Sequence, residues 1–81
     1  MSMNDFEIVL LQLVAKGDGK WSWYEIGNRL PGPFLQRTPE MYKILEKLAS
    51  EGLVTLRPAK PLDKWELTSK GRETLEALSR K

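Results

Sequence analysis

The sequence predicts a single α+β domain in which three helices are followed by a β-hairpin and a fourth helix. Two observations predict this order. Before Gly52, apolar residues recur at three- and four-residue spacing, as on one face of a helix; after it they alternate with polar residues, as in a half-buried strand. The chain has 81 residues, which is enough for one hydrophobic core and too short for two. Residues 1–81 are therefore expected to form one domain.

The first helix is expected over residues 5–16. Either Asn4 or Asp5 can cap its N-terminus, and Gly17 can end it. Its main apolar face contains Phe6, Val9, Leu10, Leu13 and Val14.

A second apolar stripe lies on the opposite side of this helix and has to be covered. It consists of Ile8, Leu11 and Ala15, which share one side of a helix that turns by about 100° per residue. One possible cover is the last helix, through Leu75 and Leu78; the other is a second copy of the chain. Since the last helix offers only a narrow stripe, we expect part of this surface to lie between two chains. Ile8, Leu11 and Ala15 are therefore candidate residues of a homodimer interface.

The second helix is expected from Trp23 to about Leu30. A serine at position 22 and a glutamate at position 25 form a capping box at its start. Three side chains are expected to face inward: Trp23, Ile26 and Leu30. Trp21, just before the cap, is a candidate short strand.

The third helix is the most clearly marked in the sequence. Thr38 is a good N-cap residue, Pro39 suits the first helical position, and Glu40 places a negative charge in the first turn. Gly52 stands just past the C-terminus, where glycine is favoured. The inward side chains are expected to be Met41, Ile44, Leu45 and Leu48.

Two short strands and a final helix follow Gly52. In each strand two apolar residues alternate with polar ones: Val54 and Leu56, then Trp65 and Leu67. The loop between them, residues 58–64, contains two prolines, and two strands around such a loop predict a hairpin. Thr68 is expected to cap the last helix, whose inward face contains Gly71, Leu75 and Leu78.

This order of elements is that of a winged helix-turn-helix domain: a three-helix core, a wing of two to three strands, and an additional C-terminal helix. Several segments carry a closer resemblance. They are Tyr24-Glu25-Ile26, Met41-Tyr42, Leu45 with Leu48, Gly52-Leu53-Val54, and Trp65-Glu66-Leu67-Thr68 with Gly71 and Leu75. Over about residues 5–78 the chain resembles the PadR-type winged-helix transcription regulators, and the wider MarR-like group is similar. The resemblance implies that the third helix enters the major groove of DNA, with Tyr42 on it, and that the wing touches the neighbouring backbone.

The charge distribution agrees with a DNA-binding surface. The net charge is +2, but residues 1–52 carry six basic and seven acidic residues, whereas residues 53–81 carry seven and four. The excess lies on Arg57, Lys60, Lys64, Lys70, Arg72, Arg80 and Lys81, and affinity for DNA comes largely from such cations placed on phosphates. The candidate DNA-binding residues are Gln36, Arg37, Thr38, Tyr42, Lys43, Lys47, Arg57, Lys60 and Lys64. Double-stranded DNA and a second copy of the chain are the expected partners.

The outward face of the third helix leaves a second interpretation open. It offers two lysines, no arginine, and nearby acids that can neutralise them at helical spacing, as Glu40 with Lys43 and Lys47 with Glu51. The alternative is therefore a winged-helix module that binds another protein and does not bind DNA. The tryptophans at positions 21, 23 and 65 are expected mainly to pack the core; a small apolar effector pocket is the other possibility.

Composition excludes several classes of function. The chain has no cysteine and no histidine, so it lacks the usual metal ligands and the commonest general base. No glycine-rich phosphate loop follows a strand. We therefore expect no enzymatic activity, no metal and no cofactor. No apolar run approaches the roughly 20 residues of a membrane span and residues 1–5 do not read as a signal peptide, so a cytoplasmic location is expected.

Overall fold

The computed structural model of the chain describes residues 4–79 and has the predicted α+β class. Arg80 and Lys81, to which the charge analysis assigned part of the basic excess, lie outside the described residues. The elements are α1 (Asp5–Gly17), α2 (Trp23–Asn28), the 3-10 helix η1 (Gly32–Arg37), α3 (Thr38–Ser50), β1 (Val54–Arg57), β2 (Lys64–Leu67) and α4 (Ser69–Ser79). The order and the approximate bounds of the four α-helices and two strands agree with those predicted from the sequence.

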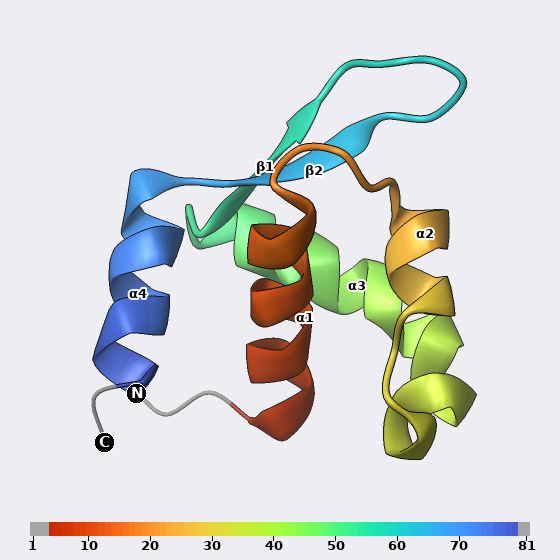
Figure 1. Cartoon of the computed structure of the whole chain (residues 1–81), viewed down its shortest axis with the longest axis horizontal. Coiled ribbons are helices and arrows are strands. Elements are labelled where there is room, and N and C mark those ends of the chain that lie inside the picture. The colour runs from red at the N-terminus through yellow and green to blue at the C-terminus, as the bar shows by residue number, and fades with distance from the viewer. Residues whose placement is uncertain (1–3, 80–81) are drawn as a thin grey trace.

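Helix α1 is the centre of the molecule. Figure 1 shows it between α4 and α2, with α3 crossing behind it and the hairpin at its C-terminal end. Four of its side chains, Phe6, Leu10, Leu11 and Val14, are almost completely buried. They pack in one hydrophobic cluster with residues from all the other α-helices and both strands. A helix that is apolar on both sides thus has a neighbour on both sides.

The second apolar stripe of α1 is covered within one chain. Leu11 is 0% exposed in the single chain, so the prediction that it contacts a second copy is wrong. Helix α4 packs beside α1, where Ala15 and Leu75 line the same surface hollow. Ile8 and Ala15 are half-buried. Leu11 belongs to the same hydrophobic cluster as Leu75 of α4, so it is covered within the chain.

The first two helices begin as their capping residues predict. The side chain of Asn4 accepts a hydrogen bond from the backbone N–H of Glu7 at 2.8 Å, and the Glu7 carboxylate accepts one from the Asn4 N–H at 3.0 Å. Ser22 and Glu25 form the same reciprocal arrangement at the start of α2. Each pair satisfies backbone donors that the first turn of a helix leaves free.

Two tryptophans lie elsewhere than predicted. Trp23, the first residue of the six-residue helix α2, is 38% exposed instead of facing inward, and the buried residues of this helix are Ile26 and Gly27. Trp21 is not part of a strand. Its carbonyl oxygen nevertheless accepts a hydrogen bond from the Trp65 N–H at 2.9 Å, so only a fragment of the expected third-strand pairing is present.

The start of α3 also differs from the prediction. The segment before it is the 3-10 helix η1, which leads directly into α3. Thr38 therefore has helical backbone angles and not the extended angles of an N-cap residue. Its hydroxyl donates to the carbonyl oxygen of Leu35 at 2.7 Å instead of accepting from the helix. Within η1, the ring of Phe34 stacks on that of Phe6 at a centroid distance of 5.3 Å and fixes this segment against α1.

The end of α3 is built as the sequence predicts. Gly52 has a φ of +79°, in the left-handed region that favours glycine. Its N–H donates to the carbonyl of Ala49, and the N–H of Leu53 donates to that of Leu48, both at 3.0 Å. These two bonds are the Schellman arrangement, which ends a helix and turns the chain sharply. The turn delivers the chain into β1.

Strands β1 and β2 pair antiparallel, with Val54 opposite Leu67 and Leu56 opposite Trp65. Val54 and Trp65 are buried, as expected, but Leu56 is 40% exposed. The hairpin extends beyond the helices (Figure 1), and Leu56 lines a surface hollow instead of belonging to the hydrophobic core. Among the described residues the sheet has two strands.

Thr68 caps α4 and also ties it to the end of α3. Its Oγ1 accepts from the N–H of Gly71 at 3.0 Å, which confirms the predicted cap. The same hydroxyl lies within hydrogen-bond distance of two carbonyl oxygens, those of Gly52 at 2.6 Å and Leu53 at 2.9 Å. Of the predicted inward residues of α4, Gly71 is buried, whereas Leu75 and Leu78 are half-buried.

Candidate nucleic-acid interface

The outward face of α3 presents Tyr42 and Lys43 to solvent. Tyr42 is 43% exposed, and Lys43 is exposed beside it. Within residues 4–79, no hydrogen bond or ion pair involves the Lys43 ammonium, and the predicted pair with Glu40 does not form. Gln36, at the end of η1, is exposed as well. These three side chains are therefore free to reach a ligand.

Arg37 is engaged within the chain. Its Nε and Nη2 both donate to one carboxylate oxygen of Glu40, at 3.1 and 2.9 Å. Its guanidinium also lies 4.5 Å from the centroid of the Phe6 ring. Glu40 and Arg37 are both largely exposed, and an exposed pair of this kind contributes about 1 kcal/mol or less. A phosphate can therefore compete for Arg37, but only against an existing partner.

Lys47 is tied more firmly, to α1. Its ammonium donates to Glu7 Oε2 at 2.6 Å, while the other oxygen of this carboxylate accepts from the Asn4 backbone. The Glu7 side chain is buried to 7% exposure. The hydrogen bond from Lys47, and then that from Asn4, lowers the pKa of Glu7 below its ordinary value; the same bond raises the pKa of Lys47. Lys47 therefore fastens α3 to α1 and is a poor candidate for a phosphate contact.

The Glu7 carboxylate should make the stability of the fold depend on pH. Because its pKa is lower in the folded chain than the ordinary 4.5, it stabilises the fold fully above that value and loses this effect as the pH falls through the folded pKa. We expect Glu7→Gln, which keeps an oxygen for the capping bond, to be less stable than wild type at neutral pH. The difference should shrink as the pH falls below 4.5 and through the folded pKa. Urea unfolding at neutral pH and at a series of acidic pH values measures it, and free energies of unfolding that change with pH in parallel in the two proteins would contradict this role for Glu7.

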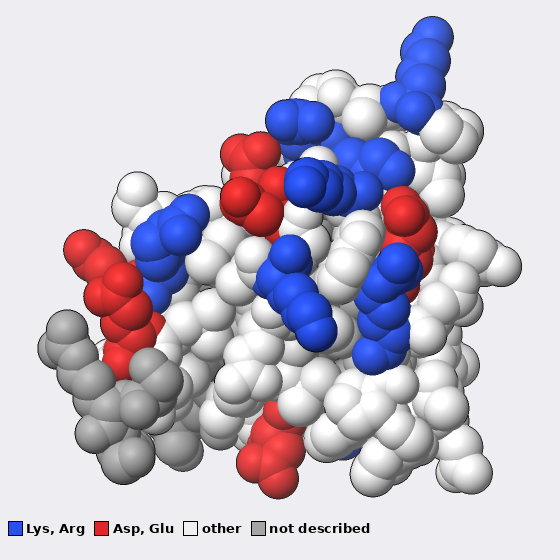
Figure 2. Space-filling view, in the orientation of Figure 1, with Lys and Arg blue, Asp and Glu red and all other residues white. Residues whose placement is uncertain are grey.

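The hairpin carries three of the predicted phosphate ligands, in different states. Lys60 is exposed in the loop, and no hydrogen bond or ion pair within residues 4–79 involves its ammonium. Arg57 is exposed and forms only a long ion pair, 3.8 Å from Glu66. Lys64 is 20% exposed and lies 3.1 Å from Glu25. Figure 2 shows Lys and Arg side chains gathered at the hairpin end of the face in view, with acidic side chains among them.

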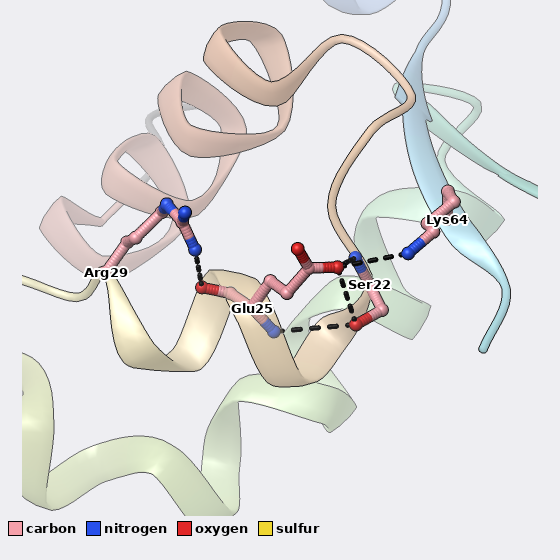
Figure 3. Close-up of polar contacts among 4 residues, drawn as sticks. All are labelled: Ser22, Glu25, Arg29 and Lys64. Carbon is pink, nitrogen blue, oxygen red and sulfur yellow. Dashed lines mark hydrogen bonds and ion pairs between the residues drawn. The ribbon is translucent and has the colours of Figure 1, made fainter. Parts of the chain in front are cut away.

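Glu25 joins the hairpin to the start of α2 (Figure 3). One of its carboxylate oxygens, Oε1, accepts from the backbone N–H and the hydroxyl of Ser22 and from the ammonium of Lys64. The Ser22 N–H, and then Lys64, lowers the pKa of Glu25. At the other end of this helix, Arg29 donates to the Glu25 carbonyl oxygen at 3.1 Å and lies 4.2 Å from the centroid of the Trp21 ring. The cluster holds Lys64 toward α2 and satisfies its charge.

A hollow of about 200 Å³ lies between α2, α3 and the hairpin. Of the three tryptophans for which the sequence left an apolar pocket open, Trp23 and Trp65 line it and Trp21 does not. Its lining consists of Trp23, Tyr42, Leu56, Leu62, Asp63 and Trp65. The ring of Tyr42 meets those of Trp23 and Trp65 at centroid distances of 6.3 and 6.4 Å. The Trp65 indole N–H is buried and has no hydrogen-bond partner among the residues that the structure describes. Alternation and helical spacing predict which residues are apolar, but not that three separate elements converge.

The candidate residues thus fall into two groups. Three of them, Gln36, Lys43 and Lys60, are exposed and free, and Arg57 is only weakly paired. Tyr42 is exposed but contacts the rings of Trp23 and Trp65. Engaged within the chain are Arg37, Thr38, Lys47 and Lys64. The contact of Tyr42 with Trp65 places α3 beside the hairpin, so both elements that carry free cations lie on adjoining parts of the fold.

In the part of the chain that the structure describes, no group of three or more acidic residues could hold a metal ion. No helix in the same residues is both long enough and apolar enough to cross a membrane.

Comparison with known proteins gives no match to a protein-family model, to a curated protein or to a solved structure. The resemblance to PadR-type regulators therefore stays a prediction. A function for this chain has to be argued from the placement and chemistry of its own residues.

Proposed function

We propose that this chain is a small winged-helix DNA-binding protein, a cytoplasmic transcription regulator. In this proposal α3 enters the major groove and the hairpin acts as the wing on the phosphate backbone. The observation that carries it is the exposure of Lys43 on α3 and Lys60 on the hairpin, both without an acidic partner among residues 4–79. Unpaired lysines on adjoining elements are suited to phosphates, whose neutralisation supplies most nonspecific affinity.

The remaining free residues suit complementary roles. Gln36 and Tyr42 are exposed as well, and glutamine can read adenine through two hydrogen bonds. Arg57 becomes available for phosphate if its long contact with Glu66 opens. Lys47 and Lys64 support the surface indirectly, because their ion pairs hold α3 to α1 and the hairpin to α2.

Replacing either free lysine, Lys43 on α3 or Lys60 on the hairpin, should weaken DNA binding. We expect Lys43→Ala and Lys60→Ala each to reduce affinity several-fold and to reduce the salt dependence by about one phosphate, or 0.9 in the log–log slope. Fluorescence anisotropy with a labelled duplex at several salt concentrations measures both quantities. Lys16→Ala is the matched control, because Lys16 is an exposed lysine on the α1–α4 side. Equal losses in all three variants would show that the binding surface is not the one proposed.

A second candidate is a winged-helix module that binds protein instead of DNA. The observation in its favour is the number of large apolar side chains left exposed on one chain: Trp23, Tyr24, Leu35, Tyr42, Leu56 and Leu62. Exposed apolar patches often mark interaction sites. Retention on a heparin column at low salt separates the candidates, since a chain that passes through unretained fits this second one.

A homodimer belongs to the first proposal, because two-fold symmetric regulators match paired half-sites on DNA. Because Leu11 is buried within one chain, the half-buried Ile8 and Ala15 remain as candidate residues of that interface. Light scattering of the wild-type chain at high concentration measures the oligomeric state directly.

A further inference from the structure

We propose that the hollow between α2, α3 and the hairpin binds a small organic cation, of the quaternary or methylated ammonium class. Its walls combine three aromatic rings, two leucines and one carboxylate, from Trp23, Tyr42, Trp65, Leu56, Leu62 and Asp63. Aromatic faces carry negative electrostatic potential and attract cations, most strongly those whose charge is poorly hydrated. An apolar hollow with one carboxylate suits a ligand that is both apolar and positively charged.

The rings form adjacent walls instead of one stacked layer. Tyr42 lies at 82° to the ring of Trp23 and at 76° to that of Trp65. Near-perpendicular rings form a corner in which one cation can contact more than one π-system. Trp65 is 3% exposed and held by the core, so this wall is fixed before a ligand arrives.

Asp63 supplies the negative charge. Its Oδ1 accepts from the backbone N–H of Ala59 at 3.2 Å, which holds the carboxylate across the hairpin loop. Within residues 4–79 no ion pair involves Asp63. The neighbouring Lys64 is turned to Glu25 of α2, so the nearest basic side chain in sequence is already neutralised.

The size of the hollow selects a compact ligand. Pockets that bury a whole drug-sized molecule measure roughly 300–1,000 Å³, whereas this one measures about 200 Å³. A trimethylammonium head group has the size and charge that this hollow suits, and the rest of the ligand would stay outside it. The titration below uses the free chain without DNA, so its outcome is independent of the function proposed above.

The test compares choline with its neutral isostere 3,3-dimethylbutan-1-ol, at constant ionic strength, by NMR of the three tryptophan indole N–H groups. We expect choline to shift the signals of Trp23 and Trp65, to leave that of Trp21 in place, and to bind at least ten-fold more tightly than the alcohol. Equal binding of the two would show a merely apolar groove. No shift with either compound at tens of millimolar would overturn the site altogether.

A second experiment measures the binding of choline and of the alcohol to variants of exposed residues. Asp63→Asn should weaken choline by several-fold and leave the alcohol unchanged, because it removes only the charge. Trp23→Ala should weaken choline at least ten-fold. Leu35→Ala is the control: Leu35 is an exposed apolar residue on η1 that does not line the hollow. A loss in Leu35→Ala as large as in Trp23→Ala would contradict the site, and a circular dichroism spectrum of each variant checks that the fold is kept.

Discussion

Gly71→Ala should destabilise the domain by about 3 kcal/mol or more, at the upper end of the cost of overpacking a core. A Cβ at this position would overlap the backbone oxygen of Leu53 and would lie 2.9 Å from Cδ1 of Leu67. A backbone oxygen cannot turn away as a flexible side chain can, so α4 would have to move off the start of the hairpin. This movement would also pull Thr68 away from Gly52 and Leu53, to whose carbonyls it is hydrogen-bonded.

Urea unfolding followed by circular dichroism measures this effect, with Gly32→Ala as the control. A Cβ at Gly32 would meet nothing within 4 Å, so that variant should stay within about 0.5 kcal/mol of wild type, as surface substitutions usually do. A Gly71→Ala protein as stable as Gly32→Ala would contradict the close packing of α4 on the hairpin.

Leu11→Lys should abolish the folded state. Leu11 is completely buried in one chain, and an unpaired ammonium in its place would be far too costly to desolvate. The milder Leu11→Ala should cost about 2–5 kcal/mol through lost burial and the cavity left behind. Loss of the helical circular dichroism signal in the lysine variant, and a lowered urea midpoint in the alanine variant, are the expected readings.

The same substitution at an exposed leucine provides the control for Leu11→Lys. Leu35 lies on η1 with half of its surface exposed, so Leu35→Lys should fold normally. A Leu11→Lys protein that keeps full helical content but has half the mass of the wild type in light scattering would contradict the internal burial. It would instead show that a second copy of the chain covers Leu11.

Local sequence signals predicted the helix ends well, because the groups that cap a helix are close in the chain. The Asn4 cap, the Ser22–Glu25 box and the glycine at position 52 each involve contacts within a few residues. Thr38 shows the limit of this reasoning. Its capping role depended on the backbone before it, and η1 was not visible in a segment rich in proline and glycine.

Burial was predicted less well, since it depends on which elements become neighbours. Trp23 and Leu56 have the right spacing to face inward, yet they lie past the edge of the core and line the hollow instead. Leu11 is the reverse case. Its position on the second apolar stripe of the first helix suggested a surface contact, yet it is buried by other elements of the chain, which the sequence of one helix cannot show.

The candidate site was predicted least well, for an electrostatic reason. In the sequence, a lysine on the outward face of a helix is predicted to have no acidic partner, but such a partner can come from a distant part of the chain. Lys47 pairs with Glu7 and Lys64 with Glu25, across 40 and 39 residues. The sequence offered Glu51 for Lys47 at helical spacing instead. Which cations remain available is therefore decided by tertiary structure.

The central claim, binding of duplex DNA by α3 and the hairpin, is tested most directly by the salt dependence of that binding. Three cations remain available there, Lys43, Lys60 and the weakly paired Arg57. Three neutralised phosphates predict a slope of log affinity against log salt between about −2 and −3. Anisotropy titrations of wild-type protein with a labelled duplex, from low to physiological salt, give this slope. A value in that range is the predicted result, and no measurable binding at the lowest salt would contradict the claim.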